Sequence, residues 1–225
     1  MTATSSDDSM APRISAAAAA AVRDWEGYFD AVADAGPRKT LLNALRRFET
    51  EGALRDGQPP LAIDLGCGTG RDTIELLNRG WRVIAQDGES DALKRMLARE
   101  EFADHPFAAH LETRCVAFNA LKLPRCDLVN ASYALPFAPP EVFDQLWRTI
   151  TDSIRPGGRF AGQLFGDEDD WASIPDRTHH SRAQLDQLFT EFEMESLDID
   201  LYGPHAETKY PKRWHIFHIV ARKRS

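Results

Sequence analysis

The sequence predicts an α/β protein with a doubly wound, seven-stranded, mostly parallel sheet and an antiparallel last strand. Strand-like segments alternate with helix-like segments through the middle of the chain, as expected of parallel β-α-β units. A glycine turn at 66–70 follows the first of these strands, at the edge where such sheets bind ligands. The last two strand-like segments, 193–201 and 214–221, leave no room for a crossover helix, so we expect them to form an antiparallel hairpin.

Apolar spacing and breaker residues place the elements in order. The expected strands are 61–65, 81–87, 112–118, 126–132, 160–165, 193–201 and 214–221. The expected helices are 14–33, 38–50, 71–79, 90–101, 140–154 and one that begins at Ser181. Gly36-Pro37 breaks the chain after the first helix, and Gly80 fits a left-handed cap after the third. We expect residues 1–12 to be a disordered tail and residues 13–225 to be a single domain.

Composition argues against several classes of protein. The formal net charge of -8 provides no basic surface for a nucleic-acid backbone, so no nucleic-acid partner is expected. No apolar run approaches the roughly 20 residues that a membrane helix needs. The three cysteines have no C-x-x-C spacing, and no His, Cys and carboxylate cluster has metal-ligand spacing, so we expect reduced thiols, a cytoplasmic location and no metal.

The glycine turn indicates the chemistry of the ligand. Its spacing is G-x-G-x-G, and Arg71 stands where a dinucleotide fingerprint has its third glycine. Asp64, two residues before the first glycine, would repel a pyrophosphate but suits a ligand with an ammonium or sulfonium charge. S-adenosylmethionine carries both of these charges and no phosphate. A second carboxylate, Asp87, ends the next strand, where it can accept hydrogen bonds from ribose hydroxyls.

On these residues the chain resembles the class I S-adenosylmethionine-dependent methyltransferases over about residues 60–165. The resemblance implies their Rossmann-like methyltransferase fold and the cofactor S-adenosylmethionine. It also implies a cofactor site made of Asp64, Gly66, Cys67, Gly68, Gly70, Asp87, Gly88, Asn119, Ala120 and Ser132. Asn119 stands where the family has an acid that contacts the adenine amino group, and its amide oxygen can accept the same hydrogen bond. Asn130, Ser132 and Tyr133, at the end of the fourth strand, should face the cofactor or the substrate.

The resemblance further divides the domain into a helical lid (13–50), a cofactor-binding core (60–165) and C-terminal segments on the substrate side (166–225). Tyr28 and Arg38 could close the site or bind the methionine carboxylate; the alternative is a lid face that is ordinary packing. Trp171 and Trp214 are candidates for the substrate wall, where an acidic loop, 167–171, could equally pair with a basic one, 208–213. The candidates for a catalytic group are Tyr133, His179 and His215.

The expected activity is methyl transfer by in-line displacement to a small-molecule acceptor. The C-terminal segments are similar to small bacterial methyltransferases of the tellurite-resistance and type 11 or 12 group, a similarity that transmits no substrate. The Asx-Pro-Pro-aromatic tetrad of enzymes that methylate DNA bases or protein glutamine is absent after the fourth strand. The alternatives are an aminopropyltransferase-like enzyme and a non-catalytic S-adenosylmethionine-binding module. The protein is expected to be a monomer or a homodimer.

Overall fold

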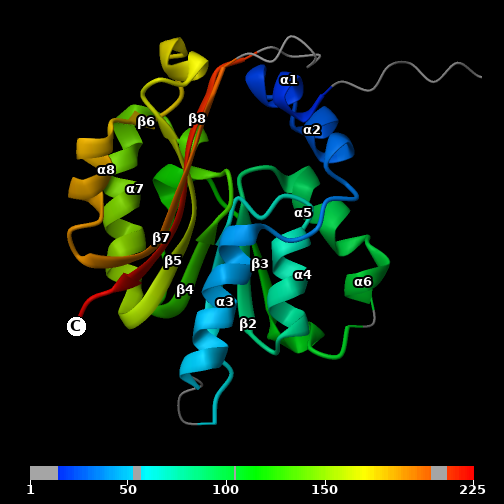
Figure 1. Cartoon of the computed structure of the whole chain (residues 1–225). Helices are drawn as coiled ribbons and strands as arrows, with labels where there is room; N and C mark the ends of the chain where they lie inside the picture. Colours follow the sequence, from blue (N-terminus) through cyan, green and yellow to red (C-terminus); the bar gives the residue numbers. More distant parts are fainter. Residues whose placement is uncertain (1–14, 53–56, 104, 204–211) are drawn as a thin grey trace, which may run out of the picture.

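The structure is a computed structural model that describes residues 15–52, 57–103, 105–203 and 212–225. Within these ranges the strands form one sheet in the order β3-β2-β1-β4-β5-β8-β7, with the short β6 beside β5 (Figure 1). The strands are β1 (Leu61–Leu65), β2 (Arg82–Asp87), β3 (Leu111–Cys115), β4 (Cys126–Ala131), β5 (Ile154–Gly166), β6 (His179–His180), β7 (Phe192–Tyr202) and β8 (Trp214–Lys223).

The pairing confirms the expected fold class. Strands β1 to β5 are parallel, β8 is antiparallel to β5, and β7 and β8 form the expected antiparallel hairpin. The sheet also has a short strand that was not expected, in which His179 and His180 pair in parallel with Phe165 and Gly166 of β5. A two-residue strand has no periodicity by which a sequence could reveal it.

Helices cover both faces of the sheet (Figure 1). They are α1 (Ala16–Ala21), α2 (Trp25–Ala31), α3 (Lys39–Glu51), α4 (Arg71–Asn78), α5 (Ser90–Leu97), α6 (Glu100–Ala103), α7 (Pro140–Ser153) and α8 (Arg182–Leu188). Single 3₁₀ turns lie at η1 (Ala108–His110), η2 (Phe118–Ala120), η3 (Leu135–Phe137) and η4 (Asp170–Ser173). Apolar residues of α3, α4 and α5 pack on one face of the sheet, and those of α7 and α8 pack on the other. Alternation along β1 supplies both cores, because Ala62 packs on the first face and Ile63 on the second.

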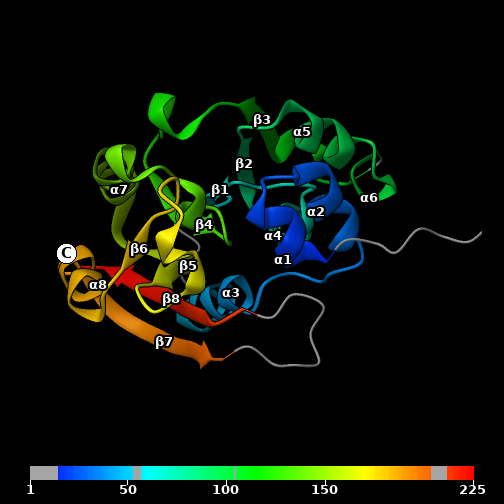
Figure 2. The same ribbon diagram turned by 90° about the horizontal axis from the view of Figure 1, so that it is seen from above.

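The expected first helix, 14–33, is broken into α1 and α2. Ser15 caps α1, Asp24 caps α2, and Arg23 between them has a left-handed φ of 56°. The two helices lie over α4 at the edge where the parallel strands end (Figure 2). The apolar spacing of this segment is helical throughout, so only the capping side chain of Asp24 could have indicated the break.

Two buried or half-buried arginines fasten this helix pair to the rest of the domain. The Arg177 guanidinium donates to the carbonyls of Ala20 (2.9 Å) and Ala21 (2.8 Å) at the end of α1. Arg23 pairs with the Asp176 carboxylate at 2.7 Å and donates to the Phe137 carbonyl at 3.1 Å. The segment is therefore held across the strand ends by directional contacts as well as by apolar packing.

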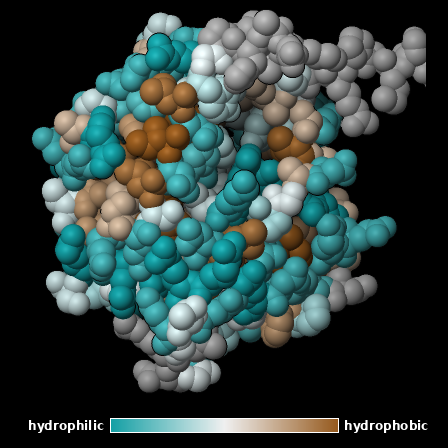
Figure 3. All heavy atoms as spheres, in the orientation of Figure 1, coloured by the Kyte–Doolittle hydropathy of each residue, from teal (hydrophilic) through white to brown (hydrophobic). Residues whose placement is uncertain are grey.

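The surface is mainly hydrophilic on the face shown in Figure 3, where the hydrophobic residues form separate patches. No helix in the described ranges is long and apolar enough to span a membrane. The same residues contain no group of three or more His, Cys, Asp and Glu side chains placed to hold a metal ion. The expected tail, 1–12, and most of the basic loop, 208–213, lie outside the described residues.

Replacing Arg177 tests how the lid is held. In Arg177→Gln the two buried carbonyls at the end of α1 lose their donor, which costs about 1–3 kcal/mol. Amide hydrogen exchange of residues 15–31 should therefore become about tenfold faster, while exchange in β1 and β4 stays unchanged. The matched control is Arg182→Gln, because Arg182 pairs only with Asp186 on the surface of α8. Equal exchange of residues 15–31 in the two variants would show that packing alone holds the lid.

Candidate active site

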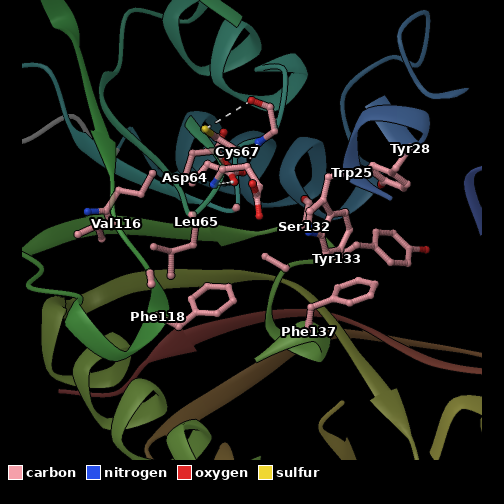
Figure 4. Close-up of a pocket in the computed structure, with 18 of the residues that line it drawn as sticks. Trp25, Tyr28, Asp64, Leu65, Cys67, Val116, Phe118, Ser132, Tyr133 and Phe137 are labelled. Atoms are coloured by element: carbon pink, nitrogen blue, oxygen red, sulfur yellow. Dashed lines mark hydrogen bonds between the residues drawn. The ribbon is translucent and has the colours of Figure 1, made fainter. Parts of the chain in front are cut away.

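A cavity of about 440 Å³ lies at the edge where β1, β2 and β4 end, beneath α1 and α2. Figure 4 shows Val116 and Phe118 at one end of it and Trp25 and Tyr28 at the other. Most of the residues expected at the site line this cavity, namely Tyr28, Asp64, Gly66, Cys67, Gly68, Asp87, Gly88, Asn119, Ser132 and Tyr133. The chain thus gathers residues from five separate segments around one space.

Two glycines of the turn after β1 lie in close contact with other parts of the chain. Gly66 has a φ of 64°, and a Cβ there would lie 2.5 Å from the Cβ of Ala134. Gly68 has a φ of 54°, and a Cβ there would meet the ring of Phe29, from the lid, at 3.3 Å. A residue with a side chain would strain both positions, so glycine keeps the backbone of this turn bare toward the cavity.

Asp87 joins the glycine turn to the end of β2. One carboxylate oxygen accepts the N–H of Gly68 at 2.8 Å, and the other accepts the N–H of Glu89 at 2.9 Å. Burial raises the pKa of Asp87, and the hydrogen bonds from these two N–H groups work against that rise. Each oxygen keeps a further lone pair, so the carboxylate can still accept hydrogen bonds from a ligand hydroxyl.

A pair of buried carboxylates lies at the centre of the cavity wall. The Asn130 side-chain amide, at the end of β4, donates to Asp64 at 2.8 Å and to Asp72 of α4 at 3.0 Å. Thr73 donates to the other oxygen of Asp64 at 2.6 Å, and the backbone N–H of Arg38 donates to the other oxygen of Asp72 at 2.8 Å. Burial and, to a lesser extent, the negative charge of Asp72 together raise the pKa of Asp64 to about 7. The pair therefore favours a cation beside it.

A guanidinium lies along the same wall. Arg71, the first residue of α4, lines the cavity and makes no hydrogen bond or ion pair within the described ranges. Burial lowers the pKa of Arg71, and the positive charge of nearby Arg38 lowers it further. No role was predicted for Asp72, and Arg71 was noted only because it replaces a glycine of the dinucleotide fingerprint. Their place at the start of the helix after the turn is the only feature that could have singled them out.

The opposite end of the cavity is mostly apolar, with two side-chain amides. Val116, Phe118 and Leu121 line it, together with Asn119 and Gln86. The Gln86 side-chain oxygen is buried and has no hydrogen-bond partner among the described residues. A buried acceptor on a cavity wall is costly unless a ligand or water donates to it, which fits a ligand that carries N–H or O–H groups at this end.

Two residues expected at the cofactor site are placed elsewhere. Gly70 does not line the cavity; it has a φ of 82°, and a Cβ there would meet the side chain of Met96 at 2.4 Å. Its glycine therefore serves the packing of α4 on α5. Ala120 also lies off the cavity wall, and its N–H donates to the Ala117 carbonyl at 3.0 Å inside a 3₁₀ turn.

Three of the expected acceptor-side residues are Tyr28, Tyr133 and Arg38. Tyr133 has a left-handed φ of 54°, and its N–H donates to the Gln163 side-chain oxygen at 3.0 Å. Burial raises the pKa of Tyr133 to about 12. Arg38 is not part of the cavity wall; its guanidinium lies over the Tyr133 ring, 4.3 Å from the centroid. A tyrosine is an uncommon residue in this backbone region, so its conformation is held by its surroundings.

The remaining expected residues lie away from the cavity. The His215 Nδ1 accepts the N–H of Glu168 at 3.2 Å, and burial lowers the pKa of His179, which lies 4.0 Å from the Asp169 carboxylate. Trp171 and Trp214 pack edge to face, with ring centroids 5.4 Å apart. The Lys212 ammonium lies over both rings and pairs with Asp169. None of these four expected residues lines the cavity.

The chain also matches known proteins. Residues 62–158 match the family described as a methyltransferase domain. No curated protein gives a significant match to the chain.

Several solved structures share the fold. TehB from Haemophilus influenzae is 16% identical with a TM-score of 0.68, and the match covers 89% of this chain and 67% of that one. The Burkholderia thailandensis 1,6-didemethyltoxoflavin-N1-methyltransferase is 20% identical with a TM-score of 0.57, over 98% and 94% of the two chains. Magnesium protoporphyrin IX methyltransferase from Synechocystis is 16% identical with a TM-score of 0.59, over 83% of each chain. The chain therefore contains a segment, residues 62–158, that matches a methyltransferase domain, and it has the fold of these solved methyltransferases.

Proposed function

We propose that this protein transfers the methyl group of S-adenosylmethionine to a small-molecule acceptor. The observation that carries the proposal is the pattern of charge along one wall of the cavity. The Asp64–Asp72 pair favours a cation, and Arg71 beside it is a guanidinium without a partner among the described residues. Together they complement the ammonium and carboxylate groups of an amino acid.

The rest of the cavity fits the remainder of the cofactor. S-adenosylmethionine supplies a methyl group activated by a positively charged sulfur. We assign Asp87 to the ribose hydroxyls, because both of its oxygens are fixed at the mouth of the glycine turn with lone pairs to spare. We assign Asn119 and the unpartnered oxygen of Gln86 to the end that takes the adenine ring, where Val116 and Phe118 provide apolar contact.

This chain's residues favour catalysis by positioning. No histidine is among the described residues that line the cavity. Tyr133 does line it, but a phenol with its pKa raised to about 12 is a hydrogen-bond donor and a poor base near pH 7. We assign α1 and α2 to a lid that limits the access of water, a role supported by Trp25, which lines the cavity and packs edge to face on Phe137 at 5.0 Å. The acceptor should therefore be a group that is already nucleophilic near neutral pH.

The alternatives differ in what they leave unexplained. An aminopropyltransferase uses a decarboxylated cofactor, which would leave the Arg71 guanidinium without an anion. A non-catalytic binding module would explain the cavity but would produce no S-adenosylhomocysteine with any acceptor. Small-molecule methylation is consistent with two enzymes of the same fold. One is the 1,6-didemethyltoxoflavin-N1-methyltransferase and the other is magnesium protoporphyrin IX methyltransferase. The three free cysteines are consistent with a cytoplasmic location.

Calorimetry followed by a turnover assay tests the function. We expect S-adenosylhomocysteine to bind with micromolar affinity and NAD not to bind. A panel of thiols, amines, phenols and carboxylic acids, assayed with S-adenosylmethionine, should then yield S-adenosylhomocysteine with at least one class. Tighter binding of NAD would overturn the cofactor assignment, and binding without turnover on any class would favour the non-catalytic module.

Changing Asp87 tests the ribose contact. Asp87→Ala should weaken S-adenosylhomocysteine binding by about 1.5–3 kcal/mol, the worth of hydrogen bonds to a charged acceptor. The core strands should stay intact, as checked by circular dichroism, because the Asp87 carboxylate accepts from backbone N–H groups of two turns, at Gly68 and Glu89. Asp91→Ala, which removes a surface carboxylate of α5, is the control. A dissociation constant equal to that of the control would place the ribose elsewhere.

The pH dependence of binding tests the acid pair. With a pKa of about 7, Asp64 is mostly protonated at pH 6 and mostly ionised at pH 8 in the free protein. An ammonium beside it requires the ionised form, so affinity for S-adenosylhomocysteine should rise up to about tenfold from pH 6 to pH 8. Methylthioadenosine, which lacks the ammonium, should show no such rise, and Asp64→Asn should flatten it. Equal slopes for the two ligands would contradict the assignment.

The same pKa has a consequence for stability. The folded protein holds the Asp64 proton more tightly than the unfolded chain, because its pKa is raised from 3.8 to about 7. The contribution of this group to the free energy of unfolding should therefore fall as pH rises between those values. Comparing urea unfolding of the wild type and Asp64→Asn at pH 5 and pH 8 isolates this contribution.

A further inference from the structure

Arg38 is a half-buried cation that nothing in the described chain neutralises. Its Nε is buried without a hydrogen-bond partner, and its side chain makes no ion pair or hydrogen bond within the described ranges. The guanidinium lies over the face of the Tyr133 ring, and the positive charge of the neighbouring Arg71 repels it. In a chain with a net charge of -8, carboxylates are plentiful, so an unpaired guanidinium at this place is costly and calls for a ligand.

The nearby carboxylates are occupied in other ways. Asp72 accepts from the backbone N–H of Arg38 and from Asn130, so it contacts the residue without pairing with its guanidinium. Asp200, whose charge acts on Tyr133, is 3.0 Å from the Nε2 of His218. The anion that Arg38 lacks is therefore not supplied by either of these side chains.

Arg38 and the Tyr133 ring beneath it, here called the Arg38–Tyr133 platform, are held in place before any ligand binds. The N–H of Tyr133 donates to the side chain of Gln163, which in turn donates to Thr40 at 3.0 Å. Thr40 lies two residues after Arg38, in the first turn of α3. This buried chain locks the left-handed backbone of Tyr133 to the segment that carries the guanidinium. Such preorganisation is typical of a recognition site, because little order is lost on binding.

The position of Arg38 separates it from the cofactor's own carboxylate. Arg71 lines the cavity beside the acid pair, whereas Arg38 is next to the cavity, with its guanidinium over the ring of Tyr133, which lines it. Aromatic rings dominate this end of the cavity: Trp25 and Tyr28 come from the lid, and Phe137 follows β4. Rings around a small space favour a flat ligand, and a planar guanidinium favours a carboxylate that can accept two hydrogen bonds.

We propose that the methyl acceptor is a small aromatic carboxylic acid whose ionised carboxylate is bound by Arg38 beside Tyr133. This inference rests on the proposed methyltransferase function and adds the class of acceptor. Arg38 thereby acts in acceptor binding and specificity, while Arg71 serves the cofactor. A neutral acceptor of the same shape should bind more weakly, because its carbonyl can accept a hydrogen bond from Arg38 but leaves the positive charge uncompensated.

Matched pairs of ligands test the proposal in the S-adenosylhomocysteine-saturated protein. The pairs are salicylate with salicylamide, anthranilate with anthranilamide, and 4-hydroxybenzoate with 4-hydroxybenzamide, measured by calorimetry at pH 7.5. At least one carboxylate should bind about tenfold or more tightly than its amide. In Arg38→Gln the ratio should fall to about one, and Arg38→Lys should restore part of it by keeping the charge.

Affinity for S-adenosylhomocysteine separates this proposal from the proposed function. Arg38→Gln should leave that affinity within about twofold of the wild type, and Arg82→Gln, at an exposed position on β2, should change neither measurement. No preference for any carboxylate, a preference that survives in a folded Arg38→Gln, or a large loss of S-adenosylhomocysteine binding in that variant would overturn the proposal. Failure of S-adenosylhomocysteine to bind the wild type would instead overturn the proposed function.

Discussion

The organisation of the site depends on one side-chain amide. Asn130 lies beside Asp64 in the register of β4 and β1, and its amide bridges that carboxylate to Asp72 of α4. Two neighbouring carboxylates repel, and burial adds to the cost, so the Asn130 bridge and the raised pKa of Asp64 make the arrangement tolerable. This part of the cavity wall therefore favours a positive charge, because the packing of α4 on the sheet brings the two acids together.

The local part of the site could be predicted from the sequence. Asp64, the glycines at 66 and 68, and Asp87 follow strands within a few residues, so strand ends in a parallel sheet bring them to one edge whatever the rest of the chain does. The fold class was predictable for the same reason, since alternating strands and helices leave few topologies. Gly70 shows the limit of such reasoning: its glycine is required by contact with Met96, which no local pattern reveals.

What the sequence did not reveal comes from contacts between distant segments. Trp214 and His215 begin β8 at the edge of the sheet where the parallel strands end. His215 packs against Gly166 and Trp214 against Trp171, and both side chains lie away from the cavity. Arg71 and Asp72 could be recognised as site residues only from their neighbours in the structure. The charge of Arg38 acts on Arg71, and the Asn130 amide donates to Asp72. The N-terminal helical segment was expected from its apolar spacing, but the contacts by which Arg23 and Arg177 hold α1 and α2 join residues more than a hundred positions apart.

The charged groups lie in a defined order along the cavity, which predicts how a ligand is oriented in it. The acid pair and Arg71 suit a zwitterion, and the Arg38–Tyr133 platform lies beyond them toward the lid. A crystal structure with S-adenosylhomocysteine tests the central claim most directly. The account requires the ligand's ammonium within hydrogen-bond distance of Asp64 or Asp72 and its carboxylate on Arg71. A ligand bound with its carboxylate on Arg38, or with its adenine beside the acid pair, would contradict it.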